Sequence, residues 1–367
     1  MKLLLSLALL LIQTPTKWTA PFKDVGLPAE PAPYLDLMKD KQELVKLDGD
    51  TLSFLFKSKQ EKVDLLCNLN LQFKKIPDSD VWIARAQMPD WDKAFFDYSF
   101  VEGGYQPGTR ATYKTWRGEK APPLPERAEV LKGTLKEYTI KSKELGEDRK
   151  ITVYIPPHAP KNLPAIFMAD GQGSEGLIRQ MEPLILKGKI RPIAIIATHA
   201  GAYKGDRSKG YDMNKDFRAR EYLKMADPDQ YAKHLRFFCD EVVPWATKEF
   251  DLSNKREDRA IQGYSNGGAF AATAAVDRPE VFGYSLPFSV AAFDRAAFKD
   301  SLTGKKLPKF YFAAGTLETF IAGTQDANKI LIEHGESPVI EAYVSGHDMA
   351  MWSLALVKYV QSIFPAK

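Results

Sequence analysis

The feature that most constrains this fold is a series of short, mostly apolar runs separated by segments with helical periodicity. The runs cover residues 165–169, 193–197, 260–264, 310–314 and 339–344, and the helical segments cover 180–187, 228–250, 267–275, 321–334 and 349–363. Buried apolar strands that alternate with helices predict a mostly parallel sheet with helices on both faces. Ligands bind beyond the carboxyl ends of the strands in such sheets. Functional residues are therefore expected directly after each run.

The N-terminal third of the chain instead alternates apolar and polar side chains with a period of two. The alternation covers residues 52–56, 63–69, 82–88 and 96–100. Because successive side chains of a strand face opposite sides, this spacing predicts half-buried antiparallel strands. We expect a small β-sandwich over 43–104 and an α/β unit over 135–367 that opens with a hairpin. The proline-rich range 21–42 and the Gly, Pro and Lys/Arg-rich range 105–134 are expected to be linkers.

Residues 1–20 have the pattern of a secretory signal peptide. Met1 and Lys2 precede a stretch from Leu3 to Ile12 in which only Ser6 is polar. Such a stretch is too short to span a membrane, so it predicts export to the periplasm or the medium. The alternative is an uncleaved amphipathic start. Elsewhere no run reaches the ~18 apolar residues that a spanning helix needs, so stable membrane insertion is not expected.

Charge and cysteine content exclude several classes of protein. The chain has 51 basic and 47 acidic side chains, a net charge of +4, which does not favour a nucleic-acid partner. It has 2 cysteines, Cys67 and Cys239, too few for a disulfide scaffold, and we expect both to be thiols. The sequence has neither zinc-binding spacings nor a phosphate-binding loop or dinucleotide fingerprint, so no metal or cofactor is predicted.

A nucleophile motif follows the run at 260–264. The residues Gly263-Tyr264-Ser265-Asn266-Gly267-Gly268 contain the G-x-S-x-G pattern between a predicted strand and a predicted helix. In that context the pattern predicts a sharp, strained turn that lifts a serine hydroxyl above the sheet. The amide of the next residue, Asn266, then points to the same place. The alternative is a glycine-rich turn with a structural serine.

A serine nucleophile needs a base, and the chain has 5 histidines. His158 lies in a proline-rich turn, His234 and His334 lie within or at the end of predicted helices, and His199 precedes the serine in sequence. The remaining one, His347, follows the strand at 339–344. Its place after the serine matches the order serine, acid, histidine. We therefore predict His347 as the base.

The acid that orients the histidine should follow the preceding strand. Glu318 stands in that place, in Gly315-Thr-Leu-Glu318 after the run at 310–314. Asp326 is the reserve candidate and Asp294 a weaker third. The alternative is that Glu318 is a carboxylate near a helix N-terminus whose only role is to stabilise the helix through its dipole.

Acyl transfer also needs donors for the developing oxyanion. The amide of Asn266 is one candidate, and the other should come from the loop after 165–169, with Gln172 favoured over its neighbour Gly171. The segment 202–222 is either a substrate loop or an ion-paired solvated loop. Candidate substrate contacts are Arg220, Tyr264 and Trp352, the last of which also fits a place in the core.

Together these motifs, with Gly346-His347-Asp348 and Trp352, resemble the putative-esterase family of α/β-hydrolases, which includes enterochelin esterases, feruloyl esterases and S-formylglutathione hydrolases. The resemblance covers about residues 135 to 365. It implies an α/β-hydrolase sheet preceded by an immunoglobulin-like sandwich, and carboxylic-ester hydrolysis through Ser265, His347 and Glu318. Many members carry Asp where Glu318 stands, and Asn266-Gly267 departs from the enterochelin esterases.

The sequence thus favours an exported serine esterase that acts on a small-molecule or polysaccharide-linked ester. Candidate substrates are a siderophore lactone, a feruloyl or acetyl plant-wall ester, and another sugar ester. A non-catalytic glycan-binding protein with a relic hydrolase domain is one alternative. A serine peptidase on the same fold is another, because esters and amides use the same machinery.

Overall fold

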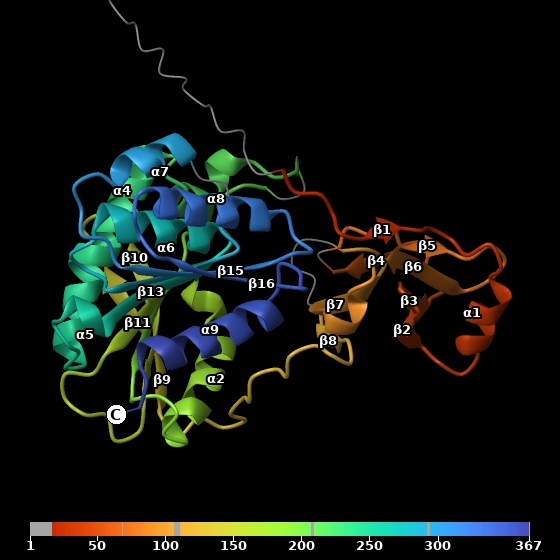
Figure 1. Cartoon of the computed structure of the whole chain (residues 1–367), viewed down its shortest axis with the longest axis horizontal. Helices are drawn as coiled ribbons and strands as arrows, with labels where there is room; N and C mark the ends of the chain where they lie inside the picture. The colour runs from red at the N-terminus through yellow and green to blue at the C-terminus, as the bar shows by residue number, and fades with distance from the viewer. Residues whose placement is uncertain (1–16, 68, 106–110, 207–208, 292–293, 367) are drawn as a thin grey trace, which may run out of the picture.

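The computed structural model describes residues 17–67, 69–105, 111–206, 209–291 and 294–366. Most of the predicted signal segment 1–20 therefore lies outside the described residues. Figure 1 shows two parts, an N-terminal part built of antiparallel sheets and a larger α/β part. None of the helices within the described ranges is long and apolar enough to cross a membrane.

The N-terminal part contains two antiparallel sheets. The first has the strand order β1-β6-β3-β2 with β5 beside β6, and the second has the order β4-β7-β8. The strands are β1 (Lys23–Asp24), β2 (Glu43–Asp48), β3 (Thr51–Lys57), β4 (Val63–Leu66), β5 (Lys74–Lys75), β6 (Val81–Gln87), β7 (Phe95–Glu102) and β8 (Lys114–Arg117). The short helices are α1 (Ala32–Leu37) and η1 (Trp91–Lys93). Aromatic side chains of β3 and β7, led by Phe54 and Phe96, fill the core between the sheets.

The two expected linkers contribute secondary structure of their own. The range 21–42 contains strand β1, which pairs with β6, and helix α1. A proline in the first turn is compatible with α1, because the backbone N–H that proline lacks would have no hydrogen-bond partner in the first turn of a helix. The range 105–134 holds β8, which pairs with β7. The immunoglobulin-like assignment stays a prediction.

The α/β part is built on an eight-stranded mixed sheet with the order β16-β15-β14-β13-β11-β12-β10-β9. Its strands are β9 (Thr134–Lys141), β10 (Asp148–Ile155), β11 (Ala165–Met168), β12 (Ala194–Thr198), β13 (Arg259–Tyr264), β14 (Tyr284–Phe288), β15 (Lys309–Gly315) and β16 (Val339–Tyr343). The predicted opening hairpin, β9 and β10, is antiparallel, and the pairings from β12 to β16 are parallel. The mostly parallel sheet was therefore predicted correctly from the apolar runs.

Helices cover both faces of this sheet, as Figure 1 shows. One apolar cluster joins the sheet to α2 (Glu175–Leu186) and α9 (Met349–Ile363). On the other face lie α3 (Phe217–Tyr222), α4 (Pro228–Arg236), the π-helical η5 (Phe237–Val242), α5 (Val243–Glu249), α6 (Asn266–Asp277), α7 (Arg295–Ser301) and α8 (Phe320–Glu333). The 3-10 helices are η2 (Gly171–Gly173), η4 (Met213–Lys215) and η6 (Arg256–Asp258).

One strand and two α-helices of this part were not predicted from the sequence. Strand β14 reads Tyr-Ser-Leu-Pro-Phe, and a proline in a central strand removes a ladder hydrogen bond and argues against a strand. Helices α3 and α7 have only 6 and 7 residues, so neither develops a clear helical period. Strand β14 is followed directly by Ser289 and α3 carries Arg218, two residues of the site described below.

Candidate active site

Ser265 lies on the turn between β13 and α6, as the motif predicted. Its backbone has φ 59° and ψ −127°, a conformation that residues other than glycine rarely adopt. The flanking glycines are required by close approach, since a Cβ at Gly263 would lie 2.1 Å from the carbonyl oxygen of Gly267. A Cβ at Gly268 would lie 2.3 Å from the carbonyl oxygen of Phe288. The local geometry is that of a nucleophile elbow.

Glu318 and His347 come together at the carboxyl ends of β15 and β16. Nδ1 of His347 contacts Oε2 of Glu318. The carboxylate is buried, with 2% of the side chain exposed, whereas 20% of the imidazole side chain is exposed. A buried carboxylate on Nδ1 fixes the orientation of the ring and stabilises an imidazolium.

Three further groups hold Glu318 and His347 in place. The other carboxylate oxygen of Glu318 accepts hydrogen bonds from Ser289 Oγ at 2.6 Å and from the amide of Gly315 at 2.8 Å. Ser289 Oγ in turn accepts the indole N–H of Trp352 at 2.8 Å. The Trp352 ring packs edge-on against His347, with 4.8 Å between centroids.

Ser289 was missed at the sequence level. It is fully buried with φ 46° and follows β14, the strand that contains proline. Had that strand been recognised, the rule that functional residues follow strand ends would have identified Ser289.

Trp352 and Tyr264 link the histidine to the elbow. Their rings stack with centroids 4.3 Å apart and planes inclined by 12°. Tyr264 directly precedes Ser265, so the Trp352 ring lies beside both the serine turn and the imidazole. Burial raises the pKa of Tyr264 above its usual range, which keeps the phenol neutral. Two of the three predicted substrate contacts, Tyr264 and Trp352, therefore lie beside Ser265 and His347, and Trp352 is itself 6% exposed.

The other candidate acids and bases have different partners. Asp326 forms an ion pair with Arg295, and Asp294 accepts a hydrogen bond from the amide of Ala297 at the start of α7. Nε2 of His199 lies 2.8 Å from Thr152 Oγ1, and His234 is fully buried among aromatic rings. The geometry thus favours Glu318 over Asp326 as the partner of His347.

The predicted oxyanion donors lie at two helix starts. Gln172 lies in the first turn of η2 and Asn266 is the first residue of α6, so neither amide has an acceptor within its helix. Asp170, which precedes η2, adopts φ 58° and ψ 47°. A Cβ at Gly267 would lie 2.9 Å from a carboxylate oxygen of Asp170, so the loop after β11 abuts the first turn of α6.

Of the two arginines in α3, Arg218 reaches the elbow. Its Nε and Nη2 donate to the two carboxylate oxygens of Asp170 at 2.6 and 2.8 Å, and Nη2 lies 3.5 Å from the carbonyl oxygen of Tyr264. Arg220, the predicted substrate contact, pairs with Asp227 at 2.6 Å. The segment 202–222 is thus extensively ion-paired.

The N-terminal part contacts the turn that carries His347. The amide of Phe95 in β7 donates to the carbonyl oxygen of Val344 at 3.0 Å, and Ser345 Oγ donates to the carbonyl oxygen of Phe95 at 2.6 Å. The amide of Ala350 donates to Asp97 Oδ2 at 3.2 Å. Hydrogen bonds to β7 therefore flank His347 on both sides.

Within the described residues no cluster of His, Cys, Asp and Glu is arranged to hold a metal ion, and Cys67 and Cys239 are both free thiols. Burial raises the pKa of each thiol to about 12, so neither is a nucleophile at neutral pH.

Comparisons with known proteins place this chain in a family. Residues 142–362 match the family model described as "Putative esterase". The chain is 25% identical over 314 residues to an endo-1,4-beta-xylanase/feruloyl esterase of Xylanibacter ruminicola, covering 77% of this chain but only 40% of that protein. The chain therefore spans less than half the length of this curated relative.

Solved structures share the fold. The enterobactin esterase of Shigella flexneri aligns with a TM-score of 0.67 and 16% identity over 89% of this chain and 97% of that one. A ferulic acid esterase of Anaeromyces mucronatus aligns with a TM-score of 0.52 and 16% identity over 65% of this chain and 92% of that one. The family match extends over most of the α/β part and more than half of the whole chain. The chain thus belongs to the "Putative esterase" family.

Proposed function

We propose that this chain is an exported serine carboxylic-ester hydrolase that acts through an acyl-enzyme. Ser265 Oγ attacks the ester carbonyl while His347 takes the hydroxyl proton and passes it to the leaving alcohol. Water then attacks the acyl-enzyme with His347 again as base, releasing the acid and regenerating the serine. The observation that carries the proposal is the contact between buried Glu318 and His347 at the strand ends beside the elbow.

The remaining roles follow from position. Glu318 holds the imidazole and stabilises its charged form, and the amides of Gln172 and Asn266 bind the oxyanion of the tetrahedral intermediate. The apolar start of the chain supports export. The two N-terminal sheets support an immunoglobulin-like module ahead of the catalytic part.

The substrate class is proposed from the similar proteins. They include a feruloyl esterase, an enterobactin esterase and a ferulic acid esterase. We propose an ester of an aromatic acid on a sugar or a siderophore lactone as the substrate. A panel of p-nitrophenyl esters, feruloyl esters, acetylated xylan and ferric enterobactin separates these possibilities.

The direct test is Ser265→Ala. We expect ester turnover to fall by about 10³-fold or more with the fold retained, as checked by circular dichroism. Labelling of the wild type, but not of the variant, by a fluorophosphonate probe is expected as well. Full turnover by Ser265→Ala would refute the mechanism, and failure of the wild type to react with the probe would favour a non-catalytic binding protein.

A further inference from the structure

Helix α3 contacts two loops that leave the sheet on one side of Ser265, one after β11, which neighbours the serine strand β13, and one after β12, the next strand along. One loop, Asp170–Gly173, follows β11 and carries the proposed oxyanion donor. The other, His199–Gly201, follows β12. Three polar residues of α3 reach these loops, namely Arg218, Glu221 and Tyr222. This arrangement lets one short helix set the position of both.

Arg218 and Tyr222 fix the first residue of the oxyanion loop. The guanidinium of Arg218 forms two parallel hydrogen bonds with the Asp170 carboxylate, of which 4% of the side chain is exposed. The hydroxyl of Tyr222 accepts the amide of Asp170 at 3.1 Å. Two-point Arg–carboxylate contacts set direction as well as distance. Asp170 is thus held at both its backbone and its side chain.

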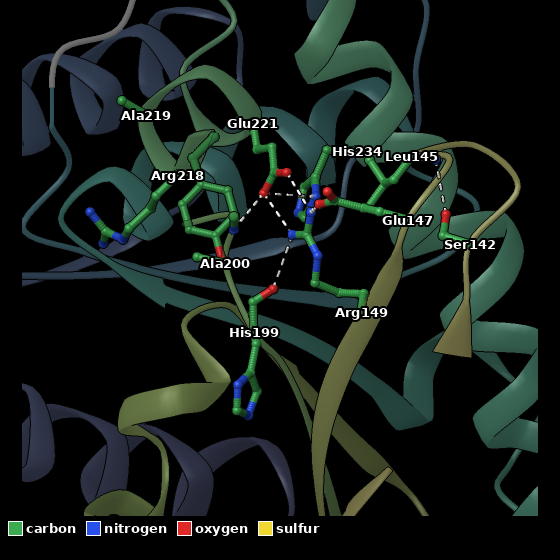
Figure 2. Close-up of polar contacts among 12 residues, drawn as sticks. Ser142, Leu145, Glu147, Arg149, His199, Ala200, Arg218, Ala219, Glu221 and His234 are labelled. Atoms are coloured by element: carbon green, nitrogen blue, oxygen red, sulfur yellow. Dashed lines mark hydrogen bonds and ion pairs between the residues drawn. The ribbon is translucent and has the colours of Figure 1, made fainter. Parts of the chain in front are cut away.

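Glu221, which directly precedes Tyr222 in α3, fixes the second loop. Its fully buried carboxylate accepts two hydrogen bonds from Arg149, at 2.7 and 2.8 Å, and one from the amide of Gly201 at 2.8 Å. Arg149 also donates to the carbonyl oxygen of His199 at 3.2 Å. Figure 2 shows Glu221, Arg149 and His234 converging on one buried cluster, whereas the Arg218 side chain extends away from it. The neighbouring residues Glu221 and Tyr222 of α3 therefore serve different loops.

The two loops also touch each other. The amide of Ala200 donates to the side-chain oxygen of Gln172 at 3.1 Å. A Cβ at Gly171 would lie 2.1 Å from the carbonyl oxygen of Ala197 and 2.7 Å from a ring carbon of His199, which explains the glycine. The position of the Gln172 backbone amide thus depends on contacts within its own loop and with the loop that follows β12.

We propose that Arg218 is a positioning residue that holds the oxyanion loop through Asp170, an inference that rests on the proposed serine mechanism. Asp170 abuts Gly267 in the first turn of α6, so displacement of its carboxylate changes the spacing between the amides of Gln172 and Asn266. Arg218 also neutralises a buried negative charge near the developing oxyanion, which that charge would otherwise repel.

The test compares Arg218→Met with Arg191→Met. Arg218 pairs with Asp170 at 2.6 Å and Arg191 pairs with Asp258 at 2.8 Å, and the two arginine side chains are 26% and 25% exposed. Arg191 and Asp258 precede β12 and β13, at the end of the sheet opposite the strand ends that carry the site. Arg218→Met is expected to lower kcat by roughly 10²-fold with KM within about twofold, because a misplacement of about 1 Å in an active site has that effect. Arg191→Met loses a comparable ion pair but is expected to keep kcat within about twofold.

A second readout separates positioning from folding. Affinity for an aryl boronic acid, which forms a tetrahedral adduct on the serine, should fall with kcat in Arg218→Met, whereas inhibition by the product acid should not change. Arg218→Lys, which keeps the charge but loses the fork, should recover part of kcat. If Arg218→Met does not fold, Arg218→Lys is expected to show the loss of kcat by itself. A folded Arg218→Met or Arg218→Lys with wild-type kcat and boronate affinity would overturn the inference while Ser265→Ala still tests the mechanism separately.

Discussion

At the scale of single residues, the site depends on backbone conformations that the surrounding structure enforces. Ser265 and Ser289 both have positive φ, at 59° and 46°, and both contribute a hydroxyl to the region of the site. Such conformations cost about 1–3 kcal/mol each and persist where packing over-determines them. Around Ser265, the glycines on either side allow the neighbouring backbone to pack closely against the turn. Ser289 is held by hydrogen bonds to both Glu318 and Trp352.

The identity of the acid is tested by Glu318→Gln against Asp326→Asn. Glutamine keeps an oxygen for Ser289 and Gly315 but gives His347 no negative charge, so kcat is expected to fall by about 10²- to 10⁴-fold. Asp326, which pairs with Arg295, should tolerate the change with kcat within about twofold. Steady-state kinetics on a p-nitrophenyl ester measures both. A large loss in Asp326→Asn alone would assign the acid to the reserve candidate.

The residue-level predictions depended on recognising the strand in front of each residue. Ser265, Glu318 and His347 follow apolar runs that are plain in the sequence, and their order along the chain favoured one serine, one acid and one base. Ser289 follows β14 and Arg218 lies in α3, and neither element was predicted from the sequence. Their importance depends on hydrogen bonds to residues that are distant along the chain, which periodicity cannot reveal.

At the scale of elements, β7 is the unexpected neighbour of the site. Its first residues bond the end of β16 and the start of α9, on either side of His347. The period-two alternation predicted β7 as a strand, because that pattern depends only on local burial. It gave no indication of which other element the strand would contact.

The contact between β7 and the histidine turn is tested by Ser345→Ala, with Ser285→Ala as the control. Both serines are fully buried, and each donates its hydroxyl to a backbone carbonyl, of Phe95 at 2.6 Å and of Ala271 at 2.9 Å. Each change should lower the free energy of unfolding by about 1 kcal/mol, as measured by urea denaturation. Only Ser345→Ala should also lower kcat, by roughly tenfold, because it loosens the turn two residues before His347. Equal kcat in the two variants would argue against a role for this contact.

At the scale of the whole molecule, two carboxylates meet where the N-terminal part contacts the α/β part. Asp97 lies on β7 and Asp348 caps α9, with Oδ1 accepting the amide of Met351 at 3.1 Å. Burial, together with the nearby charge of Asp97, raises the pKa of Asp348 to about 8. Burial likewise raises the pKa of Asp97. The junction therefore holds a proton at a pH where free carboxyl groups have lost theirs.

This junction predicts a stability that falls as the pH rises. The folded pKa of Asp348, about 8, exceeds its ordinary value of 3.8, so the folded state binds more protons than the unfolded state between these values. Its contribution to the free energy of unfolding is therefore present at about pH 4 and is lost as the pH approaches 8. Asp348→Asn keeps the cap of α9 and should flatten this slope.

Urea denaturation of Asp348→Asn at pH 5, 6.5 and 8 measures the effect. Asp92, whose side chain is only partly buried and pairs with Lys120 in the N-terminal part, supplies the control Asp92→Asn, whose pH dependence should parallel that of the wild type. Parallel curves for Asp348→Asn and wild type would show that the buried carboxyl does not titrate as described.

The central claim is that Ser265 carries the acyl group during turnover. Intact-protein mass spectrometry after rapid acid quench, with a slowly deacylated aryl ester as substrate, tests it most directly. We expect the wild type to gain the mass of one acyl group, with fragmentation placing it on Ser265, and Ser265→Ala to gain none. Turnover without any adduct on rapid quench, or an adduct on another residue, would contradict the account.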